Sequence, residues 1–500
     1  MNRIAVLSVA ASLAIAAPAA ANPAPVYNAD ARGGVYGRQF LPSTAFTDTA
    51  EADTISNIIF LNRCKGGCVI HSANNNNAAT QDSTIPNQPP GTDVTISEFP
   101  YDDTAWATVM QCVKEIYSPF NVQITDVDPG AGVVHHEIIV AGTGAELMLP
   151  QGVLGISPVS ADRTPVNNNI SFAFAGSYSN TDNPNVLFGL IDLCATIGQE
   201  TAHSWGLDHE YACVDPMTYL SPCGGQRFFR NKDIECGTGA PGECNCDGRC
   251  QTAGPTQNSH QRILGVFGPG QSIVPGPVAS IVSPADQTTV QNGFTVFMNS
   301  MGKRGTFHAR LILNGYTWVD KDVDIQPPQG TNLAPIYAKT FQLNAPTDVP
   351  DGVIDVEAQA CDDLDQCSSG KIQVTKGAPC ADASSCAKGQ KCEAGKCFWD
   401  PATGELGDDC GYPQACKSGL CLSTSGGMMC SQQCFITQAG SCPDMFECVL
   451  DNSGTGYCLP KAPDTGCCNS SATGADALAA KTGLVGLVLV IALRRRRRRA

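Results

Sequence analysis

The chain has 500 residues, 42% of them hydrophobic, which predicts two to four domains with at least one sizeable core. Between Asn22 and Cys467, 46 acidic residues outnumber 23 basic ones, so the net charge of that segment is near −23. Such a surface repels nucleic acid and anionic lipid, which excludes nucleic acid as an expected partner.

The amino-terminal residues 1–21 have the composition of a secretory signal peptide. Arg3 precedes an apolar run from Ile4 to Ala17, and small residues follow that suit cleavage before Asn22. The chain is therefore expected to be exported. In that setting its 26 cysteines are expected to form disulfides first and to bind metal as thiolates only second.

Residues 22–270 are expected to form an α/β domain with a twisted mixed sheet. Apolar residues recur at helical spacing from Thr104 to Tyr117, after a cap at Asp102 or Asp103. A second helix is predicted from Asn185, behind an N-cap at Asn183, to about Trp205, where Gly206 ends it. Strands are predicted at 55–61, 120–124, 137–141 and 170–175, and a closing helix at 258–267.

Residues 277–376 change character, because short alternating stretches such as 294–297 and 353–358 are separated by turn residues. The pattern predicts an all-β sandwich, which resembles the Ig-like modules appended to many bacterial exported enzymes. The segment 268–277 before it is rich in glycine and proline and is expected to be a linker. Cys361 and Cys367 are expected to bridge one late hairpin.

Residues 380–460 contain twelve cysteines and few apolar residues, which predicts a small disulfide-stabilised fold. The spacing of the first four cysteines is echoed by the next three, so a weak internal repeat is expected. A stalk or adhesive module is the expected role of this part of the chain. The seven cysteines of the repeat are Cys380, Cys386, Cys392, Cys397, Cys410, Cys416 and Cys421.

The segment 199–219, QETAHSWGLDHEYACVDPMTY, has the spacing of a hydrolytic zinc site. Residues four apart on a helix project from one face, so Gln199 and His203 can both reach one metal ion, with Glu200 beside them. Gly206 allows a sharp turn, after which His209 can supply a third ligand. A hydrolytic zinc site needs three protein ligands, an open position for water and a carboxylate base.

These residues, together with Met217 and Tyr219, resemble the metzincin zinc metallopeptidases. The resemblance implies that His203 and His209 bind zinc and that Glu200 is the general base. It also implies that Met217 forms the floor of the site and that Tyr219 caps the metal or hydrogen-bonds the oxyanion. The implied substrate is an extracellular protein or peptide.

Gln199 departs from the metzincin pattern, which has a histidine ligand at that position. Three interpretations follow. In the first, Gln199 binds the metal through its carboxamide oxygen, a weaker ligand, and the protein is a slow peptidase. In the second, another residue completes the site, and in the third the domain is not catalytic and only binds peptides or polymers. For the second interpretation, His135 and His136 are the nearest histidine pair, although a solvated start of a strand is their expected place. The intact Glu200 favours catalysis.

The carboxyl-terminal residues 466–500 resemble the myxobacterial sorting signal MYXO-CTERM. A Gly-Cys-Cys motif at 466–468 is followed by a spacer, an apolar segment and six arginines. The resemblance implies processing near Cys467 or Cys468 by a sorting machinery, and either membrane anchoring at the cell surface or release. An ordinary transmembrane anchor is the alternative, but residues 482–493 as a helix would span only roughly 18 Å of a core about 30 Å thick.

Overall fold

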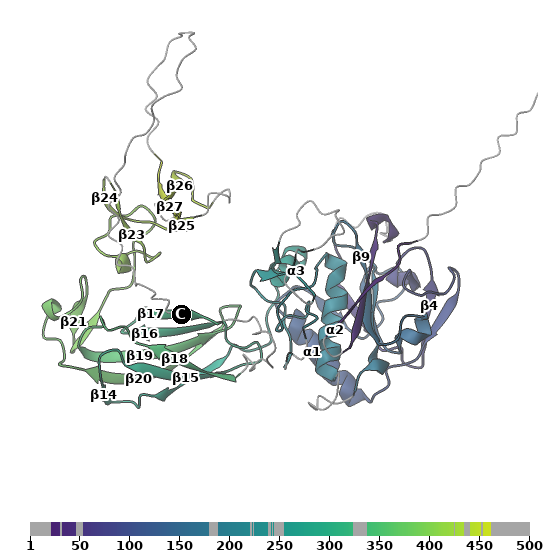
Figure 1. Ribbon diagram of the computed structural model, residues 1–500, viewed down its shortest axis with the longest axis horizontal. Coiled ribbons are helices and arrows are strands. Elements are labelled where there is room, and N and C mark those ends of the chain that lie inside the picture. The colour runs from purple at the N-terminus through teal and green to yellow at the C-terminus, as the bar shows by residue number, and fades with distance from the viewer. Residues whose placement is uncertain are drawn as a thin grey trace, which may run out of the picture.

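The computed structural model describes residues 22–461, apart from 31–32, 47–53, 180–188, 221–222, 224, 239–241, 243, 245–254, 324–337, 425, 435–440 and 452–453. Figure 1 shows a head (residues 22–274), a two-sheet region (278–376) and a cysteine-rich region (380–461). This confirms a multidomain, β-rich chain with a disulfide-rich carboxyl-terminal region. The predicted signal peptide and sorting tail lie outside the described residues. Within the described residues, none of the helices has the length and apolar character needed to cross a membrane.

The head is built on a seven-stranded mixed sheet in which β9 separates an amino-terminal hairpin from four other strands. The hairpin strand β2 pairs in parallel with β9, whereas β9 is antiparallel to β10. The strands in sheet order are β1 (Val26–Ala29), β2 (Val35–Leu41), β9 (Val153–Ser160), β10 (Ile170–Ala173), β8 (His136–Val140), β3 (Ile58–Asn62) and β7 (Gln123–Thr125).

Two helices cover one face of this sheet. Helix α1 (Asp103–Tyr117) begins as predicted, because the carboxylate of Asp102 accepts a hydrogen bond from the backbone of Ala105. Helix α2 (Leu190–Ala202) begins after the extended backbone of Gly189, its N-cap, and the predicted cap and start at Asn183 and Asn185 lie outside the described residues. A disulfide between Cys112 and Cys194 ties the two helices together.

The remaining elements of the head are short. The other sheet face is covered by a three-stranded sheet, and the predicted closing helix is confirmed as α3 (Ser259–Phe267). The expected linker packs on the head instead, because Val274 is buried in the core of the head. The short elements are β4 (Cys68–Ser72), β5 (Asp82–Ser83), β6 (Asp93–Ile96), β11 (Ile234–Glu235), β12 (Thr256–Gln257), η1 (Ser43–Ala45), η2 (Ala78–Thr80), η3 (Gly144–Leu147), η4 (Ala175–Ser177) and η5 (His203–Trp205).

The two-sheet region contains a three-stranded and a five-stranded sheet that share one core. The disulfide between Cys361 and Cys367 closes the β19–β20 hairpin, as the sequence predicts. The strands in sheet order are β13 (Val278–Ser283), β15 (Thr295–Met301) and β18 (Ala338–Asn344), then β14 (Thr288–Val290), β20 (Cys367–Lys376), β19 (Gly352–Cys361), β16 (His308–Leu313) and β17 (Tyr316–Asp322).

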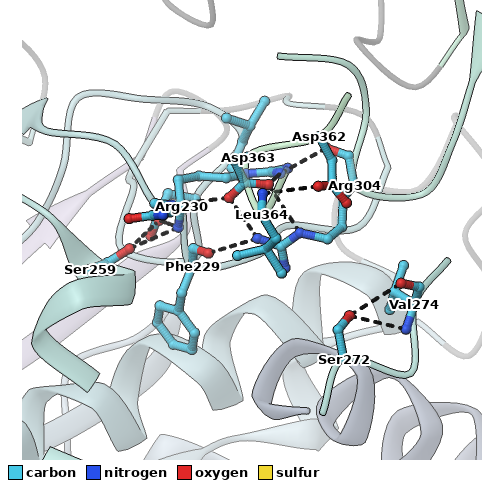
Figure 2. A network of polar contacts seen from close by, with 12 residues as sticks. Phe229, Arg230, Ser259, Ser272, Val274, Arg304, Asp362, Asp363 and Leu364 are labelled. Carbon is cyan, nitrogen blue, oxygen red and sulfur yellow. Dashed lines mark hydrogen bonds and ion pairs between the residues drawn. The ribbon is translucent and has the colours of Figure 1, made fainter. Parts of the chain in front are cut away.

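The head and the two-sheet region share a buried interface. Ala212, Val214 and Ile234 of the head belong to the core of the two-sheet region. Beside them, the carboxylate of Asp363 accepts hydrogen bonds from Arg230 of the head and from Arg304 of its own region (Figure 2). A buried carboxylate paired with two guanidinium groups is strongly stabilised in its charged form.

This interface predicts a loss of stability in acid. Burial alone would raise the pKa of Asp363, but Arg304 and Arg230 lower it from 3.8 to about 2. The contribution of the ionised carboxylate is therefore fully present above pH 3.8 and is lost as the pH falls toward 2. Denaturant unfolding of the wild type and of Asp363→Asn should show free energies of unfolding that converge by about 2 kcal/mol between pH 5 and pH 2. A difference that stays constant over this range would contradict the assignment.

The cysteine-rich region consists of three four-cysteine units with one connectivity, in which the first cysteine pairs with the third and the second with the fourth. The sequence predicts the repeated spacing of the first unit and of part of the second, but not which cysteines pair. The disulfides are Cys380–Cys392, Cys386–Cys397, Cys410–Cys421, Cys416–Cys430, Cys434–Cys448 and Cys442–Cys458. The short elements are η6 (Ala383–Ser385), β21 (Lys391–Glu393), β22 (Lys396–Phe398), η7 (Pro413–Ala415), β23 (Cys421–Thr424), β24 (Gly427–Cys430), β25 (Gln433–Cys434), β26 (Phe446–Leu450) and β27 (Gly456–Pro460).

Candidate functional site

The motif residues lie where α2 ends against β9. Gln199 and Glu200 are on the last turn of α2, and His203 opens the single 3₁₀ turn η5 that follows. Gly206 then reverses the chain with a φ of +79°, and a Cβ atom there would lie 2.1 Å from the backbone oxygen of Arg163. Only glycine fits this position, which directs the chain toward His209.

The first and third ligand positions of the motif meet in the fold. The Nε2 atom of Gln199 lies 3.5 Å from the Nε2 atom of His209, and the rings of His203 and His209 are 5.0 Å apart between centroids. Two ligands of a tetrahedral zinc ion with bonds of roughly 2.1 Å lie about 3.4 Å apart. A half-turn of the Gln199 carboxamide would place its oxygen at the same position. The spacing therefore fits two neighbouring zinc ligands.

The tautomer of His203 also suits a ligand. Its Nδ1 atom lies 2.8 Å from the backbone oxygen of Leu207, an acceptor that assigns the proton to Nδ1 and leaves the Nε2 lone pair free. That Nε2 atom is buried and has no hydrogen-bond partner within the described residues. Burial lowers the pKa of His203 to about 3, with a further contribution from Arg38, so the imidazole is in the neutral form that binds metals.

Glu200 and Tyr219 complete the polar cluster. Both carboxylate oxygens of Glu200 and the hydroxyl of Tyr219 are buried, and none of them has a hydrogen-bond partner among the residues that the structure describes. The ring of Tyr219 lies 3.9 Å from that of His209 between centroids. Burial raises the pKa of Glu200 well above its usual range, although the charge of Arg38 opposes this shift. Unpaired buried polar atoms are costly, which is typical of a site made for a ligand.

The turn that carries Met217 is held by backbone contacts to the motif. The amide of Met217 donates to the carboxylate of Asp215 at 2.8 Å, and its carbonyl accepts from the amide of Glu210 at 2.9 Å. Met217 is fully buried in the core of the head. The turn is thus fixed beside His209, which precedes Glu210 in the chain.

Two residues of β2, Tyr36 and Arg38, lie against the site, and no motif in the sequence marks them. The ring of Tyr36 stacks on Tyr219 with centroids 5.0 Å apart. The guanidinium of Arg38 pairs with Asp208, whose other oxygen accepts from Arg163 at 2.6 Å. Exposed fractions are only 1% for Gln199, 0% for Glu200 and His203, 1% for His209 and 2% for Tyr219. The site is therefore closed to a substrate in this conformation.

The expectation that His135 and His136 lie at a solvated start of a strand is wrong, because each is only 1% exposed. β8 is an interior strand of the sheet, which buries them. His136 Nε2 lies 3.4 Å from the indole nitrogen of Trp205, and among the described residues neither histidine belongs to a cluster of three metal-ligand side chains.

Four groups of His, Cys, Asp or Glu side chains in the described residues lie close enough to hold a metal ion, and Glu200, His203 and His209 do not form one of them. His308, Asp320 and Asp322 form one such group, and each four-cysteine unit supplies another. The sulfurs of the cysteine groups are already joined in disulfides, which leaves no thiolate for a metal. Cys194 and Cys213 near the motif are likewise bridged, to Cys112 and Cys223, so the expectation of disulfides ahead of metal-binding thiolates is confirmed for them.

No family model matches the chain, and no curated protein matches it. Among solved structures, fibronectin(III)-like modules of Clostridium thermocellum CbhA match 25% of this chain and 54% of that one, with 12% identity and a TM-score of 0.16. An endo-β-1,4-mannanase from Thermotoga petrophila matches 24% of this chain and 23% of its own, with 13% identity and a TM-score of 0.15. A lytic polysaccharide monooxygenase from Jonesia denitrificans matches 19% of this chain and 61% of its own, with 18% identity and a TM-score of 0.14. Such low scores support no functional argument.

Proposed function

We propose that the protein is an exported zinc metallopeptidase of the metzincin type that hydrolyses extracellular proteins or peptides and is held at the cell surface by its carboxyl-terminal tail. The observation that carries the proposal is the cluster at the end of α2. His203 meets His209, and His209 meets Gln199, in one buried place, with a free imidazole lone pair on His203. Glu200 is buried next to Gln199 in the chain; its two carboxylate oxygens have no partner within the described residues, and the charge of Arg38 acts on it as on both histidines. That donor set suits zinc and an activated water.

In this proposal His203 and His209 hold the metal through Nε2, and Gln199 supplies the third ligand through its carboxamide oxygen. Zinc, when bound, polarises the peptide carbonyl and makes a water molecule more acidic. Glu200 accepts the proton from the attacking water and later gives it to the amine that leaves when the carbon–nitrogen bond breaks.

Tyr219 has a separate role in the proposed reaction. Its hydroxyl donates a hydrogen bond to the carbonyl oxygen as negative charge develops there. The hydroxyl is buried and has no partner among the described residues, so it is available for this contact. The stacked ring of Tyr36 holds it in place in the closed conformation.

Access to the site requires that the side chains of Tyr36 and Arg38 move away from it. Tyr36 covers Tyr219, and Arg38 places a positive charge beside the two histidines. We therefore expect the closed protein to be latent. Removal of these two side chains should stabilise the open conformation relative to the closed one. A change of about 1.4 kcal/mol in that free-energy difference shifts the equilibrium between them tenfold.

The double variant Tyr36→Ala/Arg38→Ala of the full chain should cleave an unfolded protein substrate at least about tenfold faster than the wild type after zinc is added. A chelator should abolish the activity of both proteins. Gln39→Ala is the matched control, since its side chain is on the other face of β2, where it bonds Thr84 and Pro23. Absence of chelator-sensitive cleavage in both the wild type and the double variant would overturn the proposed function.

A second function, that of a surface binding or adhesion protein without catalysis, is favoured by one observation. The Gln199 carboxamide contacts His209 Nε2 at 3.5 Å, which can satisfy that ring by a hydrogen bond without any metal. The buried charge of Arg38 beside the histidines would also disfavour a cation. This alternative predicts that the wild type and the double variant fold without zinc and cleave nothing at any zinc concentration.

A further inference from the structure

The Met217 turn of the head is linked to the two-sheet region by a continuous chain of buried hydrogen bonds. Asp215 begins it: one carboxylate oxygen accepts from the amide of Met217 at 2.8 Å, and the other accepts from the amide of Arg230 at 2.9 Å. The second oxygen also accepts from the hydroxyl of Ser259 at 2.6 Å. A shift of the Arg230 backbone would therefore move Asp215 and, with it, the Met217 turn.

The side chain of Arg230 points the other way, into the two-sheet region, and contacts both sides of the interface (Figure 2). Its Nε atom donates to the carbonyl of Val214 at 3.0 Å, two residues before the proline of the turn. Its Nη1 atom donates to the carbonyl of Arg304 at 2.7 Å and to Asp363 at 3.2 Å. One guanidinium group thus joins the turn to the neighbouring region.

Asp363 is the acceptor on which these contacts converge. Its carboxylate accepts from Arg304 Nε at 3.0 Å and Nη2 at 2.6 Å, and from the amide of Asn231 at 3.0 Å. Arg304 in turn donates to the carbonyl of Phe229. The side chains of Arg230, Arg304 and Asp363 are at most 1% exposed, so water cannot replace a lost contact without rearrangement.

We propose that Asp363 is a positioning residue: through Arg230 it fixes the Val214–Met217 turn, and with it Tyr219, beside the candidate metal centre. The two-sheet region is then part of the site's support rather than a spacer. Val214 lies in the core of that region, which gives the turn an apolar contact on the same side. The role in catalysis depends on the proposed function, whereas the mechanical link does not.

Hydrogen–deuterium exchange of the full chain tests the link without requiring metal or activity. Amides of residues 212–220 should exchange at least about tenfold faster in Asp363→Asn than in the wild type. Lys303→Ala is the matched control, because Lys303 forms a second ion pair between the same two regions, with Glu115 at 2.7 Å, and its side chain is far more exposed than those of Arg230 and Asp363. It should leave exchange at 212–220 unchanged.

Asp363→Asn could unfold the chain, so Arg230→Lys serves as a second variant. Lysine keeps the positive charge next to Asp363 but cannot also reach the carbonyls of Val214 and Arg304, and it should speed exchange at 212–220 in the same way. Unchanged exchange at 212–220 in a folded variant that exchanges faster around 304–307 would overturn the proposal. A wild type that binds no zinc would instead overturn the proposed function and leave this link standing.

Discussion

Replacement of Glu200 by glutamine should lower kcat/KM of the zinc-loaded, opened protein by about 10³-fold, or about 4 kcal/mol of transition-state stabilisation. Both carboxylate oxygens of Glu200 are buried without a hydrogen-bond partner among the described residues, and a glutamine side chain at this position cannot accept the proton of water. The Tyr36→Ala/Arg38→Ala background should be used, so that access does not limit the rate. Zinc content, measured on the same sample, should not change.

Glu210→Gln is the matched control for this experiment. Glu210 is equally buried and follows His209 in the chain, but Asp215 and the Gln257 side chain are its neighbours. Its loss should leave kcat/KM within a few-fold of the starting value. Equal losses in both variants would mean that a buried carboxyl group, and not specifically a base at position 200, is what the activity requires.

The second large effect is expected at position 199. Gln199→His should tighten zinc binding by at least about 100-fold, because an imidazole is a better zinc donor than a carboxamide, and changes even beyond the direct ligands alter affinity by 10 to 100-fold. The carboxamide nitrogen of Gln199 already lies 3.5 Å from His209 Nε2, which is the spacing of two zinc ligands. A competition titration against a fluorescent chelator measures the change in Kd.

Gln199→Ala distinguishes the interpretations of this residue. If the carboxamide is a ligand, alanine should weaken binding relative to the wild type. If alanine and glutamine give the same Kd, Gln199 contributes nothing to the metal. If Gln199→His does not lower the Kd for zinc, His203 and His209 are not placed to bind the same zinc ion as position 199.

The parts of the fold that the sequence predicts are those set by local interactions. Helix α1 follows from its apolar spacing and its cap at Asp102. The spacing of the motif within 21 residues is sufficient to bring Gln199 and His209 together, because helix geometry and the turn at Gly206 place them. The disulfide at 361–367 is local for the same reason.

The parts that the sequence does not predict depend on contacts between distant segments. Arg38 meets Asp208 across 170 residues, and the parallel pairing of β2 with β9 leaves no periodic signal in either strand. His136 is buried because β8 is an interior strand of the sheet, which its own sequence does not specify. The link from Asp363 to Arg230 likewise spans two regions.

The most direct test is the zinc content of the purified, oxidised full chain after incubation with zinc and removal of the excess, with His209→Ala as the control. The account predicts about one zinc ion per chain in the wild type and its loss in the control. Substoichiometric zinc that does not depend on His209 would contradict the metal centre and leave the binding protein as the better account.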